Sequence, residues 1–153
     1  MRIVAYRIVK KQYAASMWSG EGAREFGGRW NSKGVAVVYA CENRSLAAME
    51  QLVHVVPPRV LRGFVISSVQ FDEDQVERVK MKALPAGWDR KVPPASLRRF
   101  GDEWVARGES VALAVPSAVV RGEWNYLLNP AHGEFRALIK SRPATFGYDR
   151  RLS

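Results

Sequence analysis

The sequence is poor in the side chains that form disulfides and most metal sites. It contains one cysteine, Cys41, and two histidines among its 153 residues. A single cysteine cannot pair within the chain, and so few soft ligands do not make a structural zinc site. We therefore expect no metal site, and a protein suited to a reducing cytoplasm.

Long apolar runs are also missing. Arg7 and Lys10 interrupt the N-terminal apolar stretch before it reaches the length of a signal peptide's hydrophobic region. No stretch approaches the roughly 18 apolar residues that cross a bilayer. The sequence therefore predicts a cytoplasmic protein with no membrane partner.

The sequence also has fewer acidic than basic residues. There are 15 aspartates and glutamates against 24 lysines and arginines, which gives a formal net charge of +9. This surplus favours a nucleic acid, an anionic small molecule or an acidic partner without choosing among them. The basic residues are dispersed, and no zinc-finger or RNA-recognition motif accompanies them.

The apolar content, 47% of the residues, is enough for the core of a single domain spanning 1–153. Alternating or continuous apolar patterns predict strands, and apolar residues at helical spacing predict helices. The expected strands are 3–8, 35–40, 61–71, 76–79, 110–115 and 135–139. The expected helices are 12–18, 96–107 and one that begins at Asn43 or Ser45 and ends before Pro57. We read 20–28 as an irregular glycine loop and 125–130 as a turn. This arrangement is typical of an α+β domain.

Candidate functional residues gather between Gly27 and His54. The sequence Gly27-Gly28-Arg29-Trp30-Asn31 precedes the apolar run 35–40, and the helix that follows carries Glu50 and His54. Glu50 falls at the edge of that helix's expected apolar stripe of Leu46, Met49, Leu52, Val53 and Val56. An arginine, an aromatic hydroxyl and a carboxylate are groups that suit an anionic ligand containing a sugar.

Each of these residues also has a purely structural interpretation. A carboxylate at the edge of an apolar stripe usually meets an arginine or water, and Arg29 can brace the glycine loop. Tyr39 is more often a core residue, and Ser117 a turn residue. His54 is as well placed to pair with Glu50 as to transfer protons.

The motifs taken together resemble the RES-domain toxins of bacterial RES–Xre toxin–antitoxin systems. The matching pieces occur in the family's order from residue 6 to residue 152. They are Tyr6-Arg7-Ile8, Gly28-Arg29-Trp30-Asn31, Val38-Tyr39, Ser45-Leu46-Ala47 with Glu50 and His54, Val115-Pro116-Ser117, Asn125-Tyr126-Leu127-Leu128-Asn129-Pro130 with His132, and Phe146 with Asp149-Arg150-Arg151-Leu152.

The resemblance implies a fold similar to the ADP-ribosyltransferases and an enzyme that consumes NAD as a substrate, releasing nicotinamide, with no bound cofactor. It implies Glu50, Arg29 and Tyr39 as catalytic residues and Arg7, Arg29, Tyr39, Ser117 and Asn125 as NAD-binding residues. In this interpretation Glu50 stabilises the oxocarbenium-like transition state, the arginines bind the pyrophosphate or ribose, and Tyr39 stacks on nicotinamide. Ser117 binds the ribose or positions Glu50, and Asn125 holds a neighbouring loop.

The resemblance also implies a cognate antitoxin with an Xre-like helix-turn-helix domain, so that DNA is contacted only through the antitoxin. It leaves open whether the complex is a larger oligomer and whether the acceptor is water, phosphate or a protein side chain. An ADP-ribosyltransferase that modifies a host protein is the near alternative. The distant alternatives are a basic nucleic-acid-binding module and a catalytically inactive relative.

Overall fold

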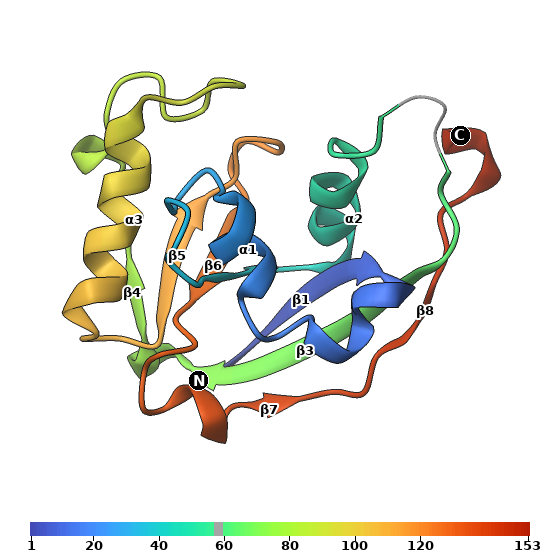
Figure 1. Ribbon diagram of the computed structural model, residues 1–153, viewed down its shortest axis with the longest axis horizontal. Coiled ribbons are helices and arrows are strands. Elements are labelled where there is room, and N and C mark those ends of the chain that lie inside the picture. The colour runs from blue at the N-terminus through green and yellow to red at the C-terminus, as the bar shows by residue number, and fades with distance from the viewer. Residues whose placement is uncertain (57–59) are drawn as a thin grey trace.

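One bent sheet organises the chain, as the computed structural model in Figure 1 shows. The structure describes residues 1–56 and 60–153, so Pro57 and Pro58 lie outside the described residues. The strands are β1 (Arg2–Lys10), β2 (Val38–Cys41), β3 (Phe64–Asp72), β4 (Val76–Arg78), β5 (Ala112–Pro116), β6 (Trp124–Leu128), β7 (Ile139–Lys140) and β8 (Ala144–Phe146). The α-helices are α1 (Glu21–Phe26), α2 (Arg44–Leu52) and α3 (Ala95–Arg107). Short 3-10 turns are η1 (Lys11–Ser16), η2 (Glu73–Gln75), η3 (Met81–Ala83), η4 (Phe135–Ala137) and η5 (Arg150–Leu152).

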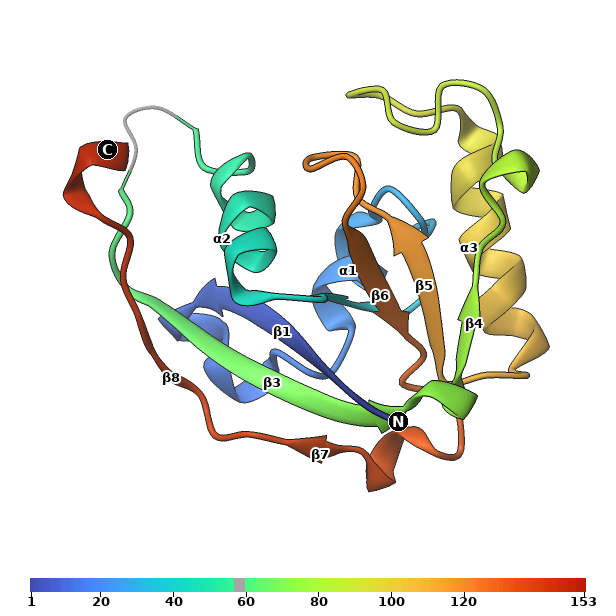
Figure 2. The ribbon, with the colours of Figure 1, turned by 180° about the vertical axis from the view of Figure 1, so that it is seen from behind.

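The sheet has two halves joined by a narrow connection. Its strand order is β4-β5-β6-β2-β1-β3-β7, and β8 also pairs with β3. The β4–β5 pair is parallel and the other pairs are antiparallel. β1 and β3 pair along their whole length, but β1 meets β2 at a single pair, Tyr6 opposite Cys41. β1 and β3 therefore run at a steep angle to β5 and β6, as Figures 1 and 2 show.

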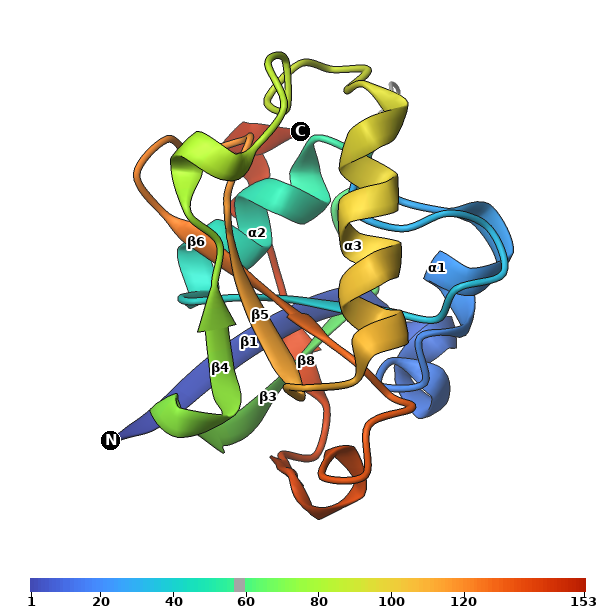
Figure 3. The same ribbon diagram turned by 90° about the vertical axis from the view of Figure 1, so that its left-hand side faces the viewer.

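The helices α2 and α3 cover the same face of this sheet, one on each half. α3 lies beside β5 and β6 (Figure 3), and its Leu97 and Trp104 pack with Leu113 of β5 and Leu127 of β6. α2 places Leu46 over the other half, in a cluster shared with β1 and β3. The opposite face of the bent sheet encloses a second apolar core. That core contains Ala5, Val38, Ala40, Val69, Phe71, Val111, Ala112, Ala114, Tyr126, Leu128, Phe135 and Leu138.

Several predictions from the sequence are confirmed. The domain is α+β, and β2 is an internal strand whose residues Val38, Ala40 and Cys41 are buried. The Asn43 side chain caps α2 by accepting the Leu46 backbone N–H at 2.7 Å. α3 ends at Gly108 in the left-handed conformation (φ 61°), as glycine allows after a helix.

Three predictions of local structure are wrong. Residues 125–130, read as a turn, contain most of β6, an internal strand between β5 and β2. The expected strand 135–139 is instead η4, followed by the short strand β7. The glycine loop at 20–28 contains α1, which begins after Gly20 and ends at Gly27, both with positive φ.

The apolar stripe of α2 is also rotated from the expected position. Leu46, Ala47 and Leu52 are buried, but Met49, Val53 and Val56 are 43%, 56% and 76% exposed. The helix ends at Leu52, earlier than expected. Because residues 46, 47 and 50 share one face of a helix, this rotation directs the side of α2 that carries Glu50 toward the sheet.

No helix among the described residues has the length and apolar character needed to cross a bilayer.

A glycine in α3 allows the helix to lie directly on the segment after α1. A Cβ atom added at Gly101 would overlap the carbonyl oxygen of Trp30, a residue that is itself 2% exposed. A backbone atom in a packed core cannot move away as a flexible side chain does. The position of Trp30 against α3 therefore requires glycine at 101.

We predict that Gly101→Ala lowers the free energy of unfolding by about 1–3 kcal/mol, because overpacking outweighs the gain in helix propensity. Urea unfolding of the purified variant measures this change. Gly22→Ala in α1 is the matched control, because a Cβ there meets no atom within 4 Å. If Gly101→Ala is as stable as Gly22→Ala, the close packing of α3 on Trp30 is not a constraint on the fold.

Candidate active site

A half-buried carboxylate on α2 is held by two side chains from the other half of the sheet. The Ser117 hydroxyl donates to Glu50 Oε1 at 2.9 Å, and Asn125 Nδ2 donates to the same oxygen at 2.7 Å. Ser117 directly follows β5, and Asn125 lies in β6. Within the described part of the chain, Glu50 Oε2 has no hydrogen-bond partner. One oxygen is thus fixed, and the other remains available to a ligand.

The two donors are themselves oriented. Ser117 Oγ accepts the backbone N–H groups of Val119 and Val120, both at 3.0 Å, so its single hydrogen is left for Glu50. Asn125 Oδ1 is buried without a hydrogen-bond partner among the described residues. An unpaired buried acceptor costs about 1–3 kcal/mol, so the amide is held toward Glu50 at some expense of stability.

Tyr39 is fixed by the segment that follows α1. Its hydroxyl donates to Asn31 Oδ1 at 2.5 Å and accepts the Trp30 backbone N–H at 3.1 Å. Gly28 lies so close that an added Cβ would be 2.6 Å from the Tyr39 hydroxyl oxygen. Burial raises the pKa of Tyr39 well above its usual range, so this hydroxyl stays protonated. It is therefore a fixed, neutral hydrogen-bonding group.

Asn31 is the residue of this network to which the sequence assigned no role. It is fully buried, and its Nδ2 donates to the carbonyl oxygens of Ala23, Ser32 and Val35 at 2.8, 3.2 and 3.0 Å. These bonds fold the 27–34 segment around the Tyr39 hydroxyl. The available signal was its place at the end of the Gly-Gly-Arg-Trp-Asn motif.

Arg29 connects the same segment to the long connection between β4 and α3. Its Nη1 donates to the carbonyl oxygens of Trp88 and Arg90 at 2.8 and 2.7 Å. These contacts match the interpretation in which Arg29 braces a loop. Nε and Nη2 have no partner in the described residues, and no carboxylate there lies within 4 Å, so one edge of the half-buried guanidinium remains free.

Arg7 lies where β1 and β2 separate. Its Nε donates to the Met17 carbonyl at 2.7 Å, and its Nη1 donates to the Tyr39 carbonyl at 3.0 Å. Desolvation lowers the pKa of this guanidinium, and no carboxylate among the described residues lies within 4 Å to compensate. The strand register places Arg7 on the sheet face opposite Tyr6. Arg7 therefore replaces the missing backbone pairing between the two strands.

The pKa of the Cys41 thiol is shifted by its burial and by the charges of Glu50 and Arg7. Burial raises the pKa of its thiol, the negative charge of Glu50 raises that pKa further, and Arg7 opposes the shift. The positive charges of Arg29 and Arg7 both lower the pKa of Tyr39 and so oppose the larger effect of burial. Within this group, Arg7 Nη1 contacts the Tyr39 carbonyl oxygen directly.

His54 does not join this cluster. It follows the end of α2, is exposed, and shows no side-chain bond to Glu50. A pairing of His54 with Glu50, one of the two roles considered for it, required the helix to continue beyond Leu52. The structure therefore brings Glu50, Ser117 and Asn125 into direct contact and leaves His54 apart.

Comparison with known proteins identifies the family. A model of the RES domain matches residues 4–149. The chain belongs to the RES-domain family. The resemblance read from the sequence motifs is thereby confirmed.

Similar proteins match nearly the whole chain. Toxin Res of Yersinia enterocolitica is 37% identical over 151 residues, which are 98% of this chain and 99% of that protein. Toxin Res of Photorhabdus laumondii is likewise 37% identical over 151 residues, covering 98% of this chain and 97% of its own. The Prs ADP-ribosylating toxin of a Sphingobium species is 32% identical over 145 residues, 93% of this chain and 90% of that protein.

The fold also matches a solved structure. The toxin–antitoxin complex MbcT–MbcA of M. tuberculosis aligns with a TM-score of 0.71 at 16% identity, over 96% of this chain and 85% of the matched chain. At this identity the likeness shows a shared fold. The roles of individual RES-domain residues stay predictions.

The buried thiol predicts how stability depends on pH. An unfolded cysteine loses its proton above about pH 8.5, whereas folded Cys41 keeps its own, so unfolding releases a proton at higher pH. The free energy of unfolding should fall above that pH with a slope of up to about 1.4 kcal/mol per pH unit. Urea unfolding between pH 7.5 and pH 10 measures the slope.

Cys41→Ala is the control for this prediction. It lowers the free energy of unfolding at every pH through the lost packing. It should also make the dependence on pH above about 8.5 shallower by up to about 1.4 kcal/mol per pH unit, the contribution of one proton. An unchanged slope in Cys41→Ala would show that the thiol ionises as readily in the folded protein as in the unfolded chain.

Proposed function

We propose that this RES domain is a toxin that cleaves the nicotinamide–ribose bond of NAD, with water or phosphate as the acceptor. The observation that carries the proposal is a carboxylate with one fixed and one free oxygen, in a chain whose Arg29 also keeps one guanidinium edge without a partner among the described residues. NAD joins an anionic pyrophosphate to a ribose that becomes cationic in the transition state. The two kinds of charge in the site are complementary to these two parts.

In the proposed reaction the bond between the ribose anomeric carbon and the pyridinium nitrogen breaks. Its electron pair goes to the nitrogen, so nicotinamide leaves as a neutral molecule without needing a proton. The ribose becomes an oxocarbenium ion, which Glu50 stabilises through its charge and through a hydrogen bond from a ribose hydroxyl to Oε2. Water then adds to the anomeric carbon and loses a proton, which gives ADP-ribose. If phosphate adds to that carbon instead, the product is ADP-ribose carrying a phosphate at the same position.

The other residues have supporting roles in this proposal. Ser117 and Asn125 position Glu50 by occupying Oε1, and Arg29 uses its free edge to bind the pyrophosphate. Tyr39 forms a wall of the nicotinamide pocket, with its hydroxyl held by Asn31. Arg7 supplies positive charge behind β2.

Transfer of ADP-ribose to a protein is the second candidate. The name of the Sphingobium relative, Prs ADP-ribosylating toxin, favours it. Both reactions break the same bond and use the same carboxylate, so they differ only in the acceptor. The MbcT–MbcA complex supports a further proposal, that an antitoxin binds this chain. We propose an Xre-like helix-turn-helix protein in this role, which would also make the contacts to DNA.

We predict that Glu50→Gln loses at least about 100-fold in NAD cleavage, the scale reported for removal of one electrostatic group from an active site. The fold should survive, because the glutamine oxygen still accepts from Ser117 and Asn125. The measurement is chromatography of nicotinamide and ADP-ribose products from purified protein, with and without phosphate.

The matched control is Glu103→Gln, which removes an exposed carboxylate from α3. Full activity in Glu103→Gln and its loss in Glu50→Gln are both expected. NAD cleavage at the wild-type rate by Glu50→Gln would overturn the mechanism. Absence of NAD cleavage by the wild type, with ADP-ribose found on a protein, would favour the second candidate.

We further predict that Arg29→Ala raises the KM for NAD by at least about 10-fold, since a charge-assisted hydrogen bond contributes about 1.5–3 kcal/mol. Steady-state kinetics separate KM from kcat. Arg136→Ala removes an exposed arginine in η4 and should leave KM unchanged. An unchanged KM in Arg29→Ala, with lower thermal stability, would mean that Arg29 serves only to brace the loop.

A further inference from the structure

A second basic site lies outside the Glu50 cluster. A cavity of about 280 Å³ separates the 27–33 segment from the first half of α3. Its lining is Phe26, Gly27, Ser32, Lys33, Ala95, Arg98 and Arg99. It shares no residue with the group formed by Glu50, Ser117 and Asn125.

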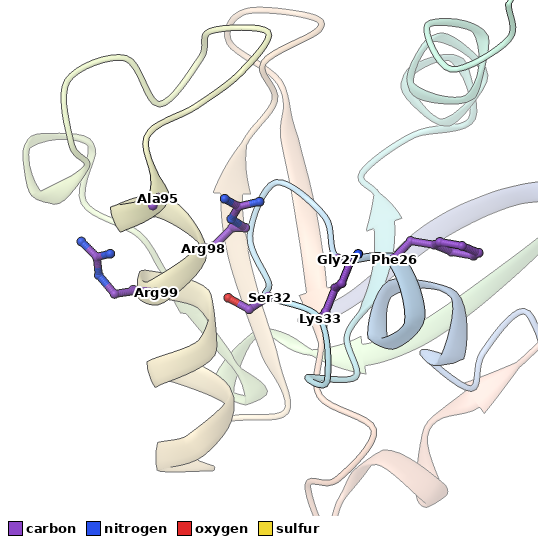
Figure 4. A pocket seen from close by; sticks show the side chains of 7 residues that line it. All are labelled: Phe26, Gly27, Ser32, Lys33, Ala95, Arg98 and Arg99. Atoms are coloured by element: carbon purple, nitrogen blue, oxygen red, sulfur yellow. The ribbon is translucent and has the colours of Figure 1, made fainter.

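The charged residues that line this cavity are all basic. Lys33, Arg98 and Arg99 border it, no lining residue is acidic, and none of the three forms an ion pair with a described residue. Figure 4 shows Arg98 extending from α3 toward the 27–33 segment and Lys33 rising from the opposite side, while Arg99 projects away. Asp102 of α3 accepts the Ser32 backbone N–H at 2.8 Å but forms no ion pair with the lining cations among the described residues. Lys33 and Arg98 thus both line the cavity without an ion-pair partner among the described residues.

The start of α3 adds to the positive potential. The helix begins at Ala95, which lines the cavity, without a side-chain cap and without an acidic residue in its first turn. Unpaired N–H groups and the helix dipole both favour an anion at such an end. Here they act beside the two cations in one cavity.

We propose that this cavity binds the phosphate or pyrophosphate group of a small ligand. Its volume is near the lower end of the range for small-molecule sites, about 300–1,000 Å³, which suits a phosphate group with a small attachment. Lys33 and Arg98 bind the oxygens from opposite sides, and the Ala95 end of α3 faces the same space. Inorganic phosphate and a phosphorylated metabolite share this chemistry.

An occupied cavity would act on the neighbouring site through the 27–33 segment. That segment carries Trp30 and Asn31, which hold the Tyr39 hydroxyl, and Arg29. An anion bound between Lys33 and Arg98 ties this segment to α3. The ligand therefore stabilises the arrangement around Tyr39 without contacting Glu50.

Calorimetric titration with inorganic phosphate and with pyrophosphate, at constant ionic strength, tests the proposal. We expect the double variant Lys33→Gln, Arg98→Gln to raise the Kd at least about 10-fold, the scale of one or two charge-assisted contacts. Arg136→Gln, which removes one distant exposed cation, should change the Kd less than about twofold. Glu50→Gln should also retain binding. The difference between the two titrants distinguishes a site for free phosphate from one for a larger phosphorylated ligand.

Three results would overturn the proposal. They are no binding by the wild-type protein, equal weakening in Arg136→Gln, and unchanged binding in the double variant. A rise of the KM for NAD in the double variant when no phosphate is added would assign the cavity to the NAD site instead. Since the titration needs no turnover, its outcome is separate from whether the chain cleaves NAD.

Discussion

The Arg7 guanidinium bridges the point at which the two halves of the sheet separate. β1 and β2 pair only at Tyr6 and Cys41, and beyond that point the Arg7 guanidinium donates to the Tyr39 and Met17 carbonyls. The Arg7 side chain thus connects two strands that are too far apart here for backbone hydrogen bonds. Its desolvation, visible in the lowered pKa of the guanidinium, is tolerated because carbonyl oxygens replace water. The two halves can then diverge, and each receives its own helix.

The candidate site lies across the junction of those two halves. α2 packs on β1 and β3 and supplies Glu50, while the β5–β6 hairpin supplies Ser117 and Asn125. The site therefore depends on the angle between the halves. The hydrogen bond between Tyr39 and Asn31 fixes the segment that leads into β2. The candidate site residues are thus held by the same contacts that set the shape of the fold.

The sequence predicted the elements whose apolar pattern is continuous or periodic, such as β2, β3 and α3. It failed at β6, because the turn-forming preferences of Asn125, Asn129 and Pro130 were applied to the whole segment, whereas only Asn129 and Pro130 lie in the turn and Asn125 lies in the strand before it. Asn125 lies in a strand, where its amide serves Glu50. The α2 stripe was misplaced for a related reason, since hydrophobicity alone assigns Met49 and Val53 inward and Glu50 to the edge. The motif order singled out Glu50 and Ser117 and offered a contact between them as one of two roles for Ser117; the fold shows that the two side chains meet.

The hydrogen bonds to Glu50 Oε1 also fix how far its carboxylate must extend. The helix axis and the β5–β6 hairpin are each positioned by their own apolar contacts, so neither can approach the other to accommodate a shorter side chain. Aspartate carries the same charge but is one methylene shorter, and it would leave the Ser117 and Asn125 donors without their acceptor. The length of the acidic side chain at position 50, as much as its charge, is therefore a requirement of this architecture.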